Sequence, residues 1–496
     1  MPDDSLDVPL LKVYSLDIEV DPIGSHFPKP EDANDPITLI SICDQHEKTV
    51  VTFGINPYNG KWKDSEFLTY THCKNEQILL INFFNYMHQN PCDVLTGWYV
   101  ESFDLLYLVN RAKNIFGENN NVFPKISPIN RVRVWNTKDG YVNIDISGIT
   151  ILDYLDVYQW YGPSLPSYKL DFVCQHELGK GKLDYSEYEN LSNLCTENWD
   201  LYVEYNIIDT WRVIELEEKN GYIKLIQTIS LLCRAPMKNY RTMTVLIEGL
   251  LLTYYRRNNL CAPHFQGGTQ EWFPAAIVKE PQKGMFEWVV DLDITSSYPT
   301  AIITLNMSPE TYYGRILGMT ESEVTTCTSK RDFPPFEIIL DRGKVKITGP
   351  KLEVFNKALK KRLLAIAPCG SVFTTSRPGI MAQVERQVFK KRNSVRKKRS
   401  KLLASLPELR DETLKNTKEK IDRYFSVQLA LKILLNSFFG ITSVPYSRYF
   451  NINISEAITS CGRCTILSGE KFVNNLLNNP NDGILDVISK MKREIK

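Results

Sequence analysis

The segment Val13-Tyr14-Ser15-Leu16-Asp17-Ile18-Glu19-Val20 constrains the fold more than any other part of this sequence. Its β-branched and apolar residues predict a β-strand, yet two acidic residues occupy alternate positions in it. Side chains two residues apart on a strand lie on the same face. On a buried strand, Asp17 and Glu19 would therefore repel each other and lose hydration unless a cation lies between them.

The segments around this strand predict an α/β domain. Residues 38–43 and 49–53 predict two more strands of an antiparallel meander, and residues 94–98 predict a short apolar strand. Further predictions are helices at 75–90, 103–112 and 198–217 and a hairpin at 131–147 with its turn at Asp139-Gly140. Three strands followed by alternating helices and strands are typical of a mixed sheet covered by helices.

The second half of the sequence predicts a smaller β region and then long helices. The expected strands are 288–294, 312–317 and 336–340, and a buried helix is expected at 246–255. Residues 382–405 and 411–439 predict two long, charged helices that form an antiparallel pair joined by the turn at 407–410. A last helix is predicted at 454–477, before a Lys/Arg-rich tail.

Charge and cysteine usage limit the partners and the setting. The 496 residues contain 59 Lys+Arg and 58 Asp+Glu, a net charge of +1, so a polyanion would have to bind a local basic patch. Residues 386–401 supply one, with nine Lys or Arg and no acid. Eleven scattered cysteines indicate reduced thiols and a cytosolic protein, and no apolar run is expected to span a membrane. Lys180-Gly-Lys182 predicts a solvated turn.

Two more acidic positions accompany the first pair. Asp104 is expected at a strand-to-helix junction, and Asp209 follows Tyr205 by one helical turn, on the same helix face. Four carboxylates from separate elements can converge on two divalent cations, and oxygen ligands suit Mg²⁺ or Mn²⁺. Two such ions stabilise the attacking and leaving oxygens of a displacement at phosphorus. Ordinary alternatives are an N-cap at Asp104, a surface salt bridge at Asp209 and an edge acid at Glu19.

A second set of residues suits triphosphate binding. Asp293 is expected at the end of a strand, where the following turn (Thr295 to Pro299) presents backbone amides that can bind phosphate. The two long helices can form a cationic clamp around a triphosphate, from residues spaced three or four apart on facing sides: Arg392, Arg396 and Arg399 on one helix, Lys432 and Asn436 on the other. A capped turn and a solvated basic face are the alternatives.

The acidic motifs resemble those of a known family. Asp17-Ile-Glu19, the stretch from Gly97 to Asp104, and Tyr205-x-x-x-Asp209 resemble the three exonuclease motifs of family B DNA polymerases, in particular the replicative polymerases of tailed phages. The resemblance implies a ribonuclease H-like 3′–5′ exonuclease domain whose four carboxylates bind two Mg²⁺ or Mn²⁺ ions. Tyr205 would orient the attacking water or the scissile phosphate. Tyr99 stands where the family usually has Asn.

The second set resembles the palm and fingers motifs of the same family. Asp291 to Pro299 is similar to the first palm motif, with Ser297 in place of Leu, and residues 432–440 are similar to the fingers motif, with Phe439 in place of Tyr. The resemblance implies that Asp293 ligates both catalytic metals, assisted by the Ile294 carbonyl. It assigns the triphosphate to Ser296, Ser297, Tyr298, Arg392, Arg396, Lys432 and Asn436. It also implies that Tyr298 excludes ribonucleotides and that Phe439 stacks on the nascent base pair.

The resemblance predicts an α/β multidomain protein with an incomplete polymerase core. The expected parts are a short N-terminal remnant (1–12), the exonuclease domain (13–235), the first part of the palm (236–375), helical-hairpin fingers (376–443) and a truncated second part of the palm (444–496). No Asp-x-Asp follows Gly440, although a family B palm needs such a motif and then a thumb. The sequence therefore predicts the N-terminal part of a split polymerase, completed by a second polypeptide. A truncated reading frame is the alternative.

The function predicted is DNA-directed DNA synthesis with 3′–5′ proofreading. Its partners would be primer-template DNA, deoxynucleoside triphosphates, the second polypeptide and a sliding clamp, in the cytoplasm of a phage-infected bacterial cell. Two other functions stay open: a stand-alone 3′–5′ DNA exonuclease whose remaining parts only grip DNA, and a non-catalytic DNA-binding remnant.

Overall fold

The structure is a computed structural model that describes residues 9–21, 27–136, 142–265, 267–269, 271–281, 283–285, 293–406 and 411–478. The chain divides into two compact units. The N-terminal unit comprises Asp3–Thr228 and Pro236–Arg241, and the C-terminal unit comprises Ile229–Ala235 and Thr242 onward.

A mixed sheet forms the centre of the N-terminal unit, with strand order β4-β3-β2-β1-β5-β8. Strand β1 (Val13–Val20) pairs antiparallel with β2 and parallel with β5. The other strands of the unit are β2 (Ile37–Asp44), β3 (Thr49–Gly54), β4 (Leu68–His72), β5 (Val94–Thr96), β8 (Thr150–Ile151) and the separate hairpin β6 (Val132–Asn136) and β7 (Val142–Ile146). Strand β1 is therefore an inner strand, and both of its edges are paired.

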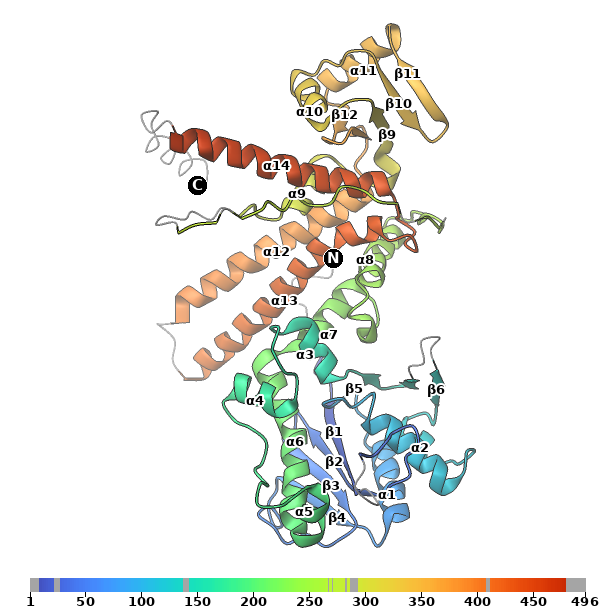
Figure 1. The fold of residues 1–496 in the computed structure, drawn as a ribbon, viewed down its shortest axis with the longest axis vertical. Coiled ribbons are helices and arrows are strands. Elements are labelled where there is room, and N and C mark those ends of the chain that lie inside the picture. The colour runs from blue at the N-terminus through green and yellow to red at the C-terminus, as the bar shows by residue number, and fades with distance from the viewer. Residues whose placement is uncertain are drawn as a thin grey trace. The chain divides into compact units, whose positions relative to one another are not determined.

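Helices pack on both faces of this sheet (Figure 1). Helices α1 (Glu76–Gln89) and α2 (Asp104–Phe116) cover one face and bury Leu16 and Ile18 of β1 in an apolar core. Helix α6 (Trp199–Asn220) covers the opposite face. The remaining helices are η1 (Phe123–Ile126), α3 (Tyr154–Tyr161), α4 (Leu170–Leu178), α5 (Leu191–Glu197), α7 (Tyr222–Cys233) and η2 (Met237–Asn239). The alternation of β1 therefore turns its two acids toward α6.

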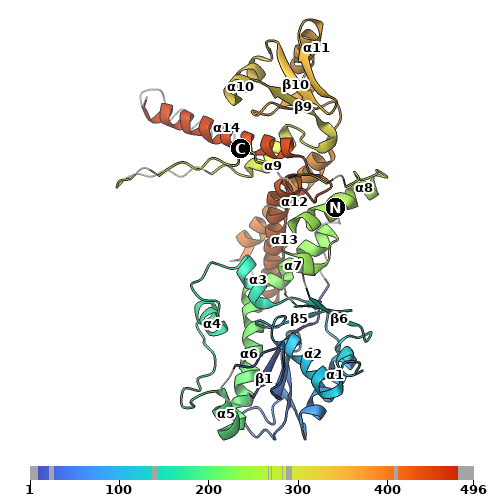
Figure 2. The same cartoon turned by 45° about the vertical axis from the view of Figure 1, so that its right-hand side comes forward.

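The C-terminal unit contains an antiparallel sheet and a set of long helices. The sheet has the order β11-β10-β9-β13-β12. It packs on α10 and α11 through a core that includes Ile316, Val324 and Phe355 (Figure 2). The elements are β9 (Tyr312–Leu317), α10 (Glu321–Lys330), β10 (Phe336–Leu340), β11 (Gly343–Ile347), α11 (Pro350–Lys360), β12 (Leu364–Ile366) and β13 (Ser371–Thr374).

The helical part of this unit is organised around an antiparallel pair, α12 (Ile380–Ser405) and α13 (Asp411–Ser443), which lie side by side (Figure 1). Short α9 (Ser297–Thr304) packs against α12, α13 and α14. The other helices are α8 (Met243–Arg257), η3 (Pro309–Thr311) and α14 (Ile452–Asn478). The turn after Asp293 thus leads directly into a helix that contacts both long helices and α14.

Most of the predicted elements are confirmed. The strands at 13–20, 312–317 and 336–340 have the predicted bounds, and the long helices extend a few residues beyond theirs. The predicted strand at 288–294 lies mostly outside the described residues, and Asp293 and Ile294 are not in a strand. The turns at Asp139-Gly140 and 407–410 and the C-terminal tail also lie outside the described residues.

One helix is long and apolar enough to pass a length and composition test for a membrane span. By length and a mean hydropathy of 1.4, the part of α13 from Thr413 to Ser443 could cross a membrane; no other described helix passes this test. It packs along α12 and α8 of the same unit. We therefore interpret it as a core helix. All eleven cysteines are free thiols.

Candidate active sites

The first carboxylate set comes together on the α6 side of the N-terminal sheet. Asp17 and Glu19 lie on β1, Asp104 is the first residue of α2, and Asp209 lies on α6. Glu19, Asp104 and Asp209 are buried, at 9%, 3% and 5% exposure. Each of the four carboxylates is close enough to another to shift its pKa. The structure thus brings the four side chains near one another, and their role as one site stays a prediction.

Hydrogen bonds from two different elements orient two of these carboxylates. The amide of Asn206 on α6 donates to Asp17 Oδ2 at 2.6 Å, so one helix carries both Asp209 and a partner for β1. The backbone N–H of Ile18 donates to Asp104 Oδ1 at 3.0 Å, which ties the start of α2 to the strand. Asn206 was missed by the sequence analysis, although it lies between Tyr205 and Asp209 on the same helix.

Burial and mutual repulsion make this set reluctant to ionise. Loss of hydration and the charge of Asp209 raise the pKa of Asp17 to about 8. Burial, together with the charges of Asp17 and Asp209, raises the pKa of Glu19 well above its ordinary value. Burial and Asp17 do the same to Asp104. A cation bound among these carboxylates would offset both their lost hydration and their mutual repulsion.

One protein cation already lies in the set, where the sequence predicted a solvated turn. Lys182 Nζ donates to Tyr205 Oη at 2.9 Å and to Asp209 Oδ2. Although burial opposes its charge, Asp209 and Tyr205 raise the pKa of Lys182 above its ordinary value. The prediction was wrong at Lys182 because a short Lys-Gly-Lys sequence gives no sign of the distant carboxylate that its side chain meets. Lys180 does remain exposed, in a pair with Glu215.

The donor chemistry of this site fits divalent metal ions. The ligands available are carboxylate oxygens, which Mg²⁺ and Mn²⁺ prefer. Asp209 Oδ1 is buried and has no hydrogen-bond partner among the described residues, so this oxygen is left without a donor. As arranged here, no three His, Cys, Asp or Glu side chains in the described part of the chain surround one point as metal ligands. Lys182 and Asn206 are bonded to Oδ2 of Asp209 and of Asp17. Ion binding would therefore have to displace the Lys182 ammonium from Asp209.

The loop before Asp104 is fixed by Asp153, which the sequence analysis also missed. Its carboxylate accepts hydrogen bonds from the backbone N–H groups of Tyr99 (3.0 Å) and Glu101 (3.1 Å), and it caps the N-terminus of α3. Burial raises the pKa of Asp153 to about 7. Tyr99 is half-exposed and has a left-handed backbone with φ = 70°. Asn tolerates that conformation better than Tyr does.

The second site lies in the C-terminal unit, where α9, α12 and α13 meet. Arg392 on α12 approaches the Ser296 hydroxyl, Nη1 to Oγ, at 3.5 Å. Phe439 on α13 packs on Tyr298 of α9, with 5.4 Å between ring centroids. Burial and the neighbouring Arg396 lower the pKa of Arg392. The structure therefore brings the predicted turn together with a residue from each long helix.

The other predicted residues of this site are more open. Asp293 and Ile294 are exposed, as are Arg396, Lys432 and Asn436, while Ser297 is half-buried. Arg399 points elsewhere, because its guanidinium stacks on Phe425 of α13 at 4.9 Å. Gly462 of α14 was not predicted. A Cβ atom there would lie 3.0 Å from Cε1 of Tyr298, so the glycine leaves room for that ring.

Both parts of the chain match known family models and known proteins. Residues 1–173 match the family model described as DNA polymerase family B, exonuclease domain, and residues 237–494 match DNA polymerase family B. The DNA-directed DNA polymerase of Escherichia phage RB69 is 28% identical over 514 residues, which cover 94% of this chain and 55% of the relative. That of Enterobacteria phage T4 is 27% identical, with 94% and 56% covered. A Pyrococcus glycovorans DNA polymerase is 24% identical, with 98% and 54% covered. The chain spans about half the length of these relatives.

Proposed function

The chain belongs to DNA polymerase family B, and from this premise we propose that its N-terminal unit removes nucleotides from the 3′ end of DNA by hydrolysis. The observation that carries the proposal is the gathering of Asp17, Glu19, Asp104 and Asp209 in a buried site where Lys182 pairs with Asp209. Such a site is costly to maintain without a function, because each buried carboxylate loses hydration.

The residues of this site would have different roles in the hydrolysis. The four carboxylates would hold two Mg²⁺ or Mn²⁺ ions, which supply positive charge to the attacking and leaving oxygens at phosphorus. The Tyr205 hydroxyl, held by Lys182, is placed to orient water or the scissile phosphate. Asn206 and the Ile18 backbone keep Asp17 and Asp104 in position.

The test is Mg²⁺-dependent digestion of a single-stranded primer labelled at its 5′ end. Asp17→Asn and Asp209→Asn should each lower the rate by at least about a thousandfold, since metal stabilisation is worth several kcal/mol. Glu218→Gln is the matched control, because Glu218 lies on the same helix as Asp209 but pairs with Lys48 near the surface. Digestion that survives both aspartate substitutions would exclude the assignment.

For the C-terminal unit, we propose binding of a deoxynucleoside triphosphate by α9, α12 and α13. Arg392, Arg396, Lys432 and Asn436 would contact the phosphates, together with the turn at Ser296 and Ser297. Asp293 and the Ile294 carbonyl would hold metal ions, Tyr298 would exclude a ribose 2′-hydroxyl, and Phe439 would stack on the base pair. The contacts of Arg392 with Ser296 and of Phe439 with Tyr298 support this proposal.

We propose that these two units act in synthesis on primer-template DNA, with a sliding clamp, in the cytoplasm of an infected bacterium. Synthesis would also use a second palm carboxylate and a thumb, which no Asp-x-Asp after Gly440 supplies within residues 1–496. Primer extension by residues 1–496 alone at a normal rate would refute the need for these further parts. The domain boundaries within the C-terminal unit rest on the same proposal.

A stand-alone 3′–5′ exonuclease is the second candidate function. The observation that favours it is that all four carboxylates of the first site come from one unit of this chain. If it is correct, adding the product of the neighbouring reading frame and nucleotides will give no primer extension, while digestion continues. If the split polymerase is correct, the same addition will give extension that Asp293→Asn abolishes.

A further inference from the structure

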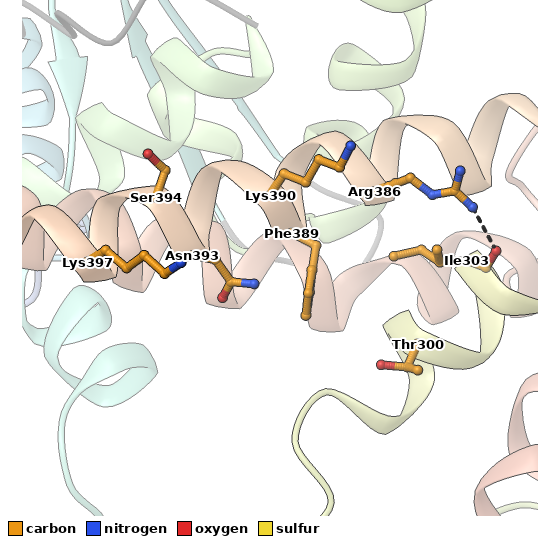
Figure 3. A pocket seen from close by; sticks show the side chains of 8 residues that line it. All are labelled: Thr300, Ile303, Arg386, Phe389, Lys390, Asn393, Ser394 and Lys397. Atoms are coloured by element: carbon orange, nitrogen blue, oxygen red, sulfur yellow. Dashed lines mark hydrogen bonds between the residues drawn. The ribbon is translucent and has the colours of Figure 1, made fainter. Parts of the chain in front are cut away.

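A cavity in the C-terminal unit lies beside the nucleotide site but uses other residues. It has a volume of about 610 Å³ and lies between α9 and α12 (Figure 3). We call it the α9–α12 groove, and its lining residues are Thr300, Ile303, Arg386, Phe389, Lys390, Asn393, Ser394 and Lys397. Phe389 and Asn393 project from α12 on the side of α9, and Lys390 and Ser394 form the rim (Figure 3).

The groove carries positive charge that the protein does not neutralise. Arg386, Lys390 and Lys397 line it and are exposed, and none of its lining residues is acidic. Within the described part of the chain, these three cations have no carboxylate partner; Arg386 donates to the Ile303 backbone carbonyl at 3.2 Å. A groove of this kind attracts an anion.

The groove is on a different face of α12 from the proposed triphosphate clamp. Arg386, Lys390, Asn393 and Lys397 follow a spacing of four, three and four residues, which defines one helix face. At about 100° per residue, the centre of that face is turned by roughly 110° from the face of Arg392 and Arg396, and Phe389 lies at the edge of the groove next to the clamp. An anion in the groove would therefore not be the triphosphate held by Arg392.

The length of the groove indicates the kind of anion. At 1.5 Å per residue, Arg386 and Lys397 lie about 16 Å apart along the helix axis, too far apart for one phosphate or pyrophosphate to contact both. One strand of B-form DNA carries a phosphate about every 3.4 Å along the axis, and an extended single strand spaces them further apart, so a groove of this length spans more than one phosphate. The half-buried ring of Phe389 adds an aromatic surface of the kind on which bases stack.

We propose that the α9–α12 groove binds the phosphodiester backbone of single-stranded DNA, outside the nucleotide site. The cations contact successive phosphates, and the Thr300 hydroxyl and Asn393 amide donate hydrogen bonds to them. Phe389 supports a base. The inference deepens the proposed function, because it takes DNA as the substrate.

The test is equilibrium binding of a fluorescent 16-residue oligothymidylate to the whole chain in EDTA, without nucleotide. The triple variant Arg386→Gln/Lys390→Gln/Lys397→Gln should bind at least tenfold more weakly at 50 mM salt. Its slope of log affinity against log salt should be smaller by about 2, from a loss of about 0.7 per phosphate contact. Phe389→Leu should weaken binding severalfold with an unchanged salt slope.

The matched control is Arg342→Gln/Lys344→Gln/Lys351→Gln, which removes the same charge from exposed positions at β10–β11 and α11. It should retain the affinity and slope of the unmodified chain. Equal losses of oligonucleotide affinity in the two triple variants would mean that only the total positive charge matters, which would overturn the proposal. So would a groove variant that loses binding of inorganic tripolyphosphate but keeps binding of the oligonucleotide. Since no metal is present, this result is independent of the exonuclease test.

Discussion

The two candidate sites of this molecule have opposite excess charges. The site at β1, α2 and α6 is buried and has an excess of negative charge, with Lys182 as its counter-charge. The site at α9, α12 and α13 is more open and has an excess of positive charge around Arg392. The difference indicates what each one lacks: the first is suited to receive metal cations, and the second to receive a phosphate anion.

The largest expected effect tests whether Lys182 stands in for a metal ion. Lys182→Gln leaves Asp209 buried without a counter-charge, so the free energy of unfolding of the metal-free protein should fall by about 3 kcal/mol. Mn²⁺ should restore much of the loss. Lys180→Gln, which removes an exposed pair with Glu215, should cost less than about 1 kcal/mol in chemical denaturation. Equal effects of the two substitutions would contradict the counter-charge role.

The cationic site can be tested by the affinity for a deoxynucleoside triphosphate. Arg392→Gln should weaken binding about tenfold to a hundredfold in isothermal titration, since a hydrogen bond to a charged group is worth about 1.5–3 kcal/mol. Arg342→Gln changes the same charge at an exposed position and should leave the affinity as it is. If both variants bind alike, Arg392 does not contact the phosphates.

A buried acid in the C-terminal unit shows what burial alone does to the pKa of a carboxylate, without the repulsion present in the first site. Glu385 of α12 is fully buried, and neither carboxylate oxygen has a partner among the described residues. Burial alone raises the pKa of Glu385 well above its ordinary value of 4.5. The folded state then holds the proton more tightly than the unfolded chain does, so stability is present below about pH 4.5 and is lost as the pH rises toward the folded-state pKa.

Glu385→Leu should therefore raise the free energy of unfolding by about 1–3 kcal/mol at pH 8, and by less at pH 4.5. Denaturant unfolding at the two pH values measures this difference, and Glu385→Gln separates the effect of charge from that of polarity. A gain that does not depend on pH would mean that the folded protein does not keep Glu385 protonated.

The smallest effect concerns the strained loop before Asp104. Tyr99→Asn should stabilise the protein by up to about 1 kcal/mol, because Asn adopts the left-handed backbone at this position at lower cost. Thermal unfolding measures the change, and Tyr99→Phe should give none. A loss of stability in Tyr99→Asn would show that the contacts of the tyrosine ring stabilise the fold by more than the left-handed backbone destabilises it.

The sequence was informative where local pattern determines structure. Strand β1 alternates so regularly that its bounds and the common face of Asp17 and Glu19 followed directly from it. The i, i+4 spacing of Tyr205 and Asp209 likewise follows from any helix at that position. The convergence of β1, α2 and α6 was predicted only through the family motifs, because nothing local in the sequence specifies which elements pack together.

The residues that were missed act over long distances in the sequence. Lys182 meets Asp209, and Asp153 fixes the backbone of Tyr99, through contacts that 27 and 54 residues of sequence separate. Gly462 matters only because α14 packs against α9 and leaves room for Tyr298. Such partners have no fixed spacing, so they become visible only when the elements are placed in space.

The central claim is that the buried carboxylates of the N-terminal unit form a site for divalent cations. The most direct measurement is Mn²⁺ binding followed by electron paramagnetic resonance at pH 8, with the whole chain and its Asp17→Asn/Asp209→Asn variant. The account predicts saturable binding to the unmodified chain and a loss of at least a hundredfold in affinity in the variant. Equal Mn²⁺ affinity in the two proteins would contradict it.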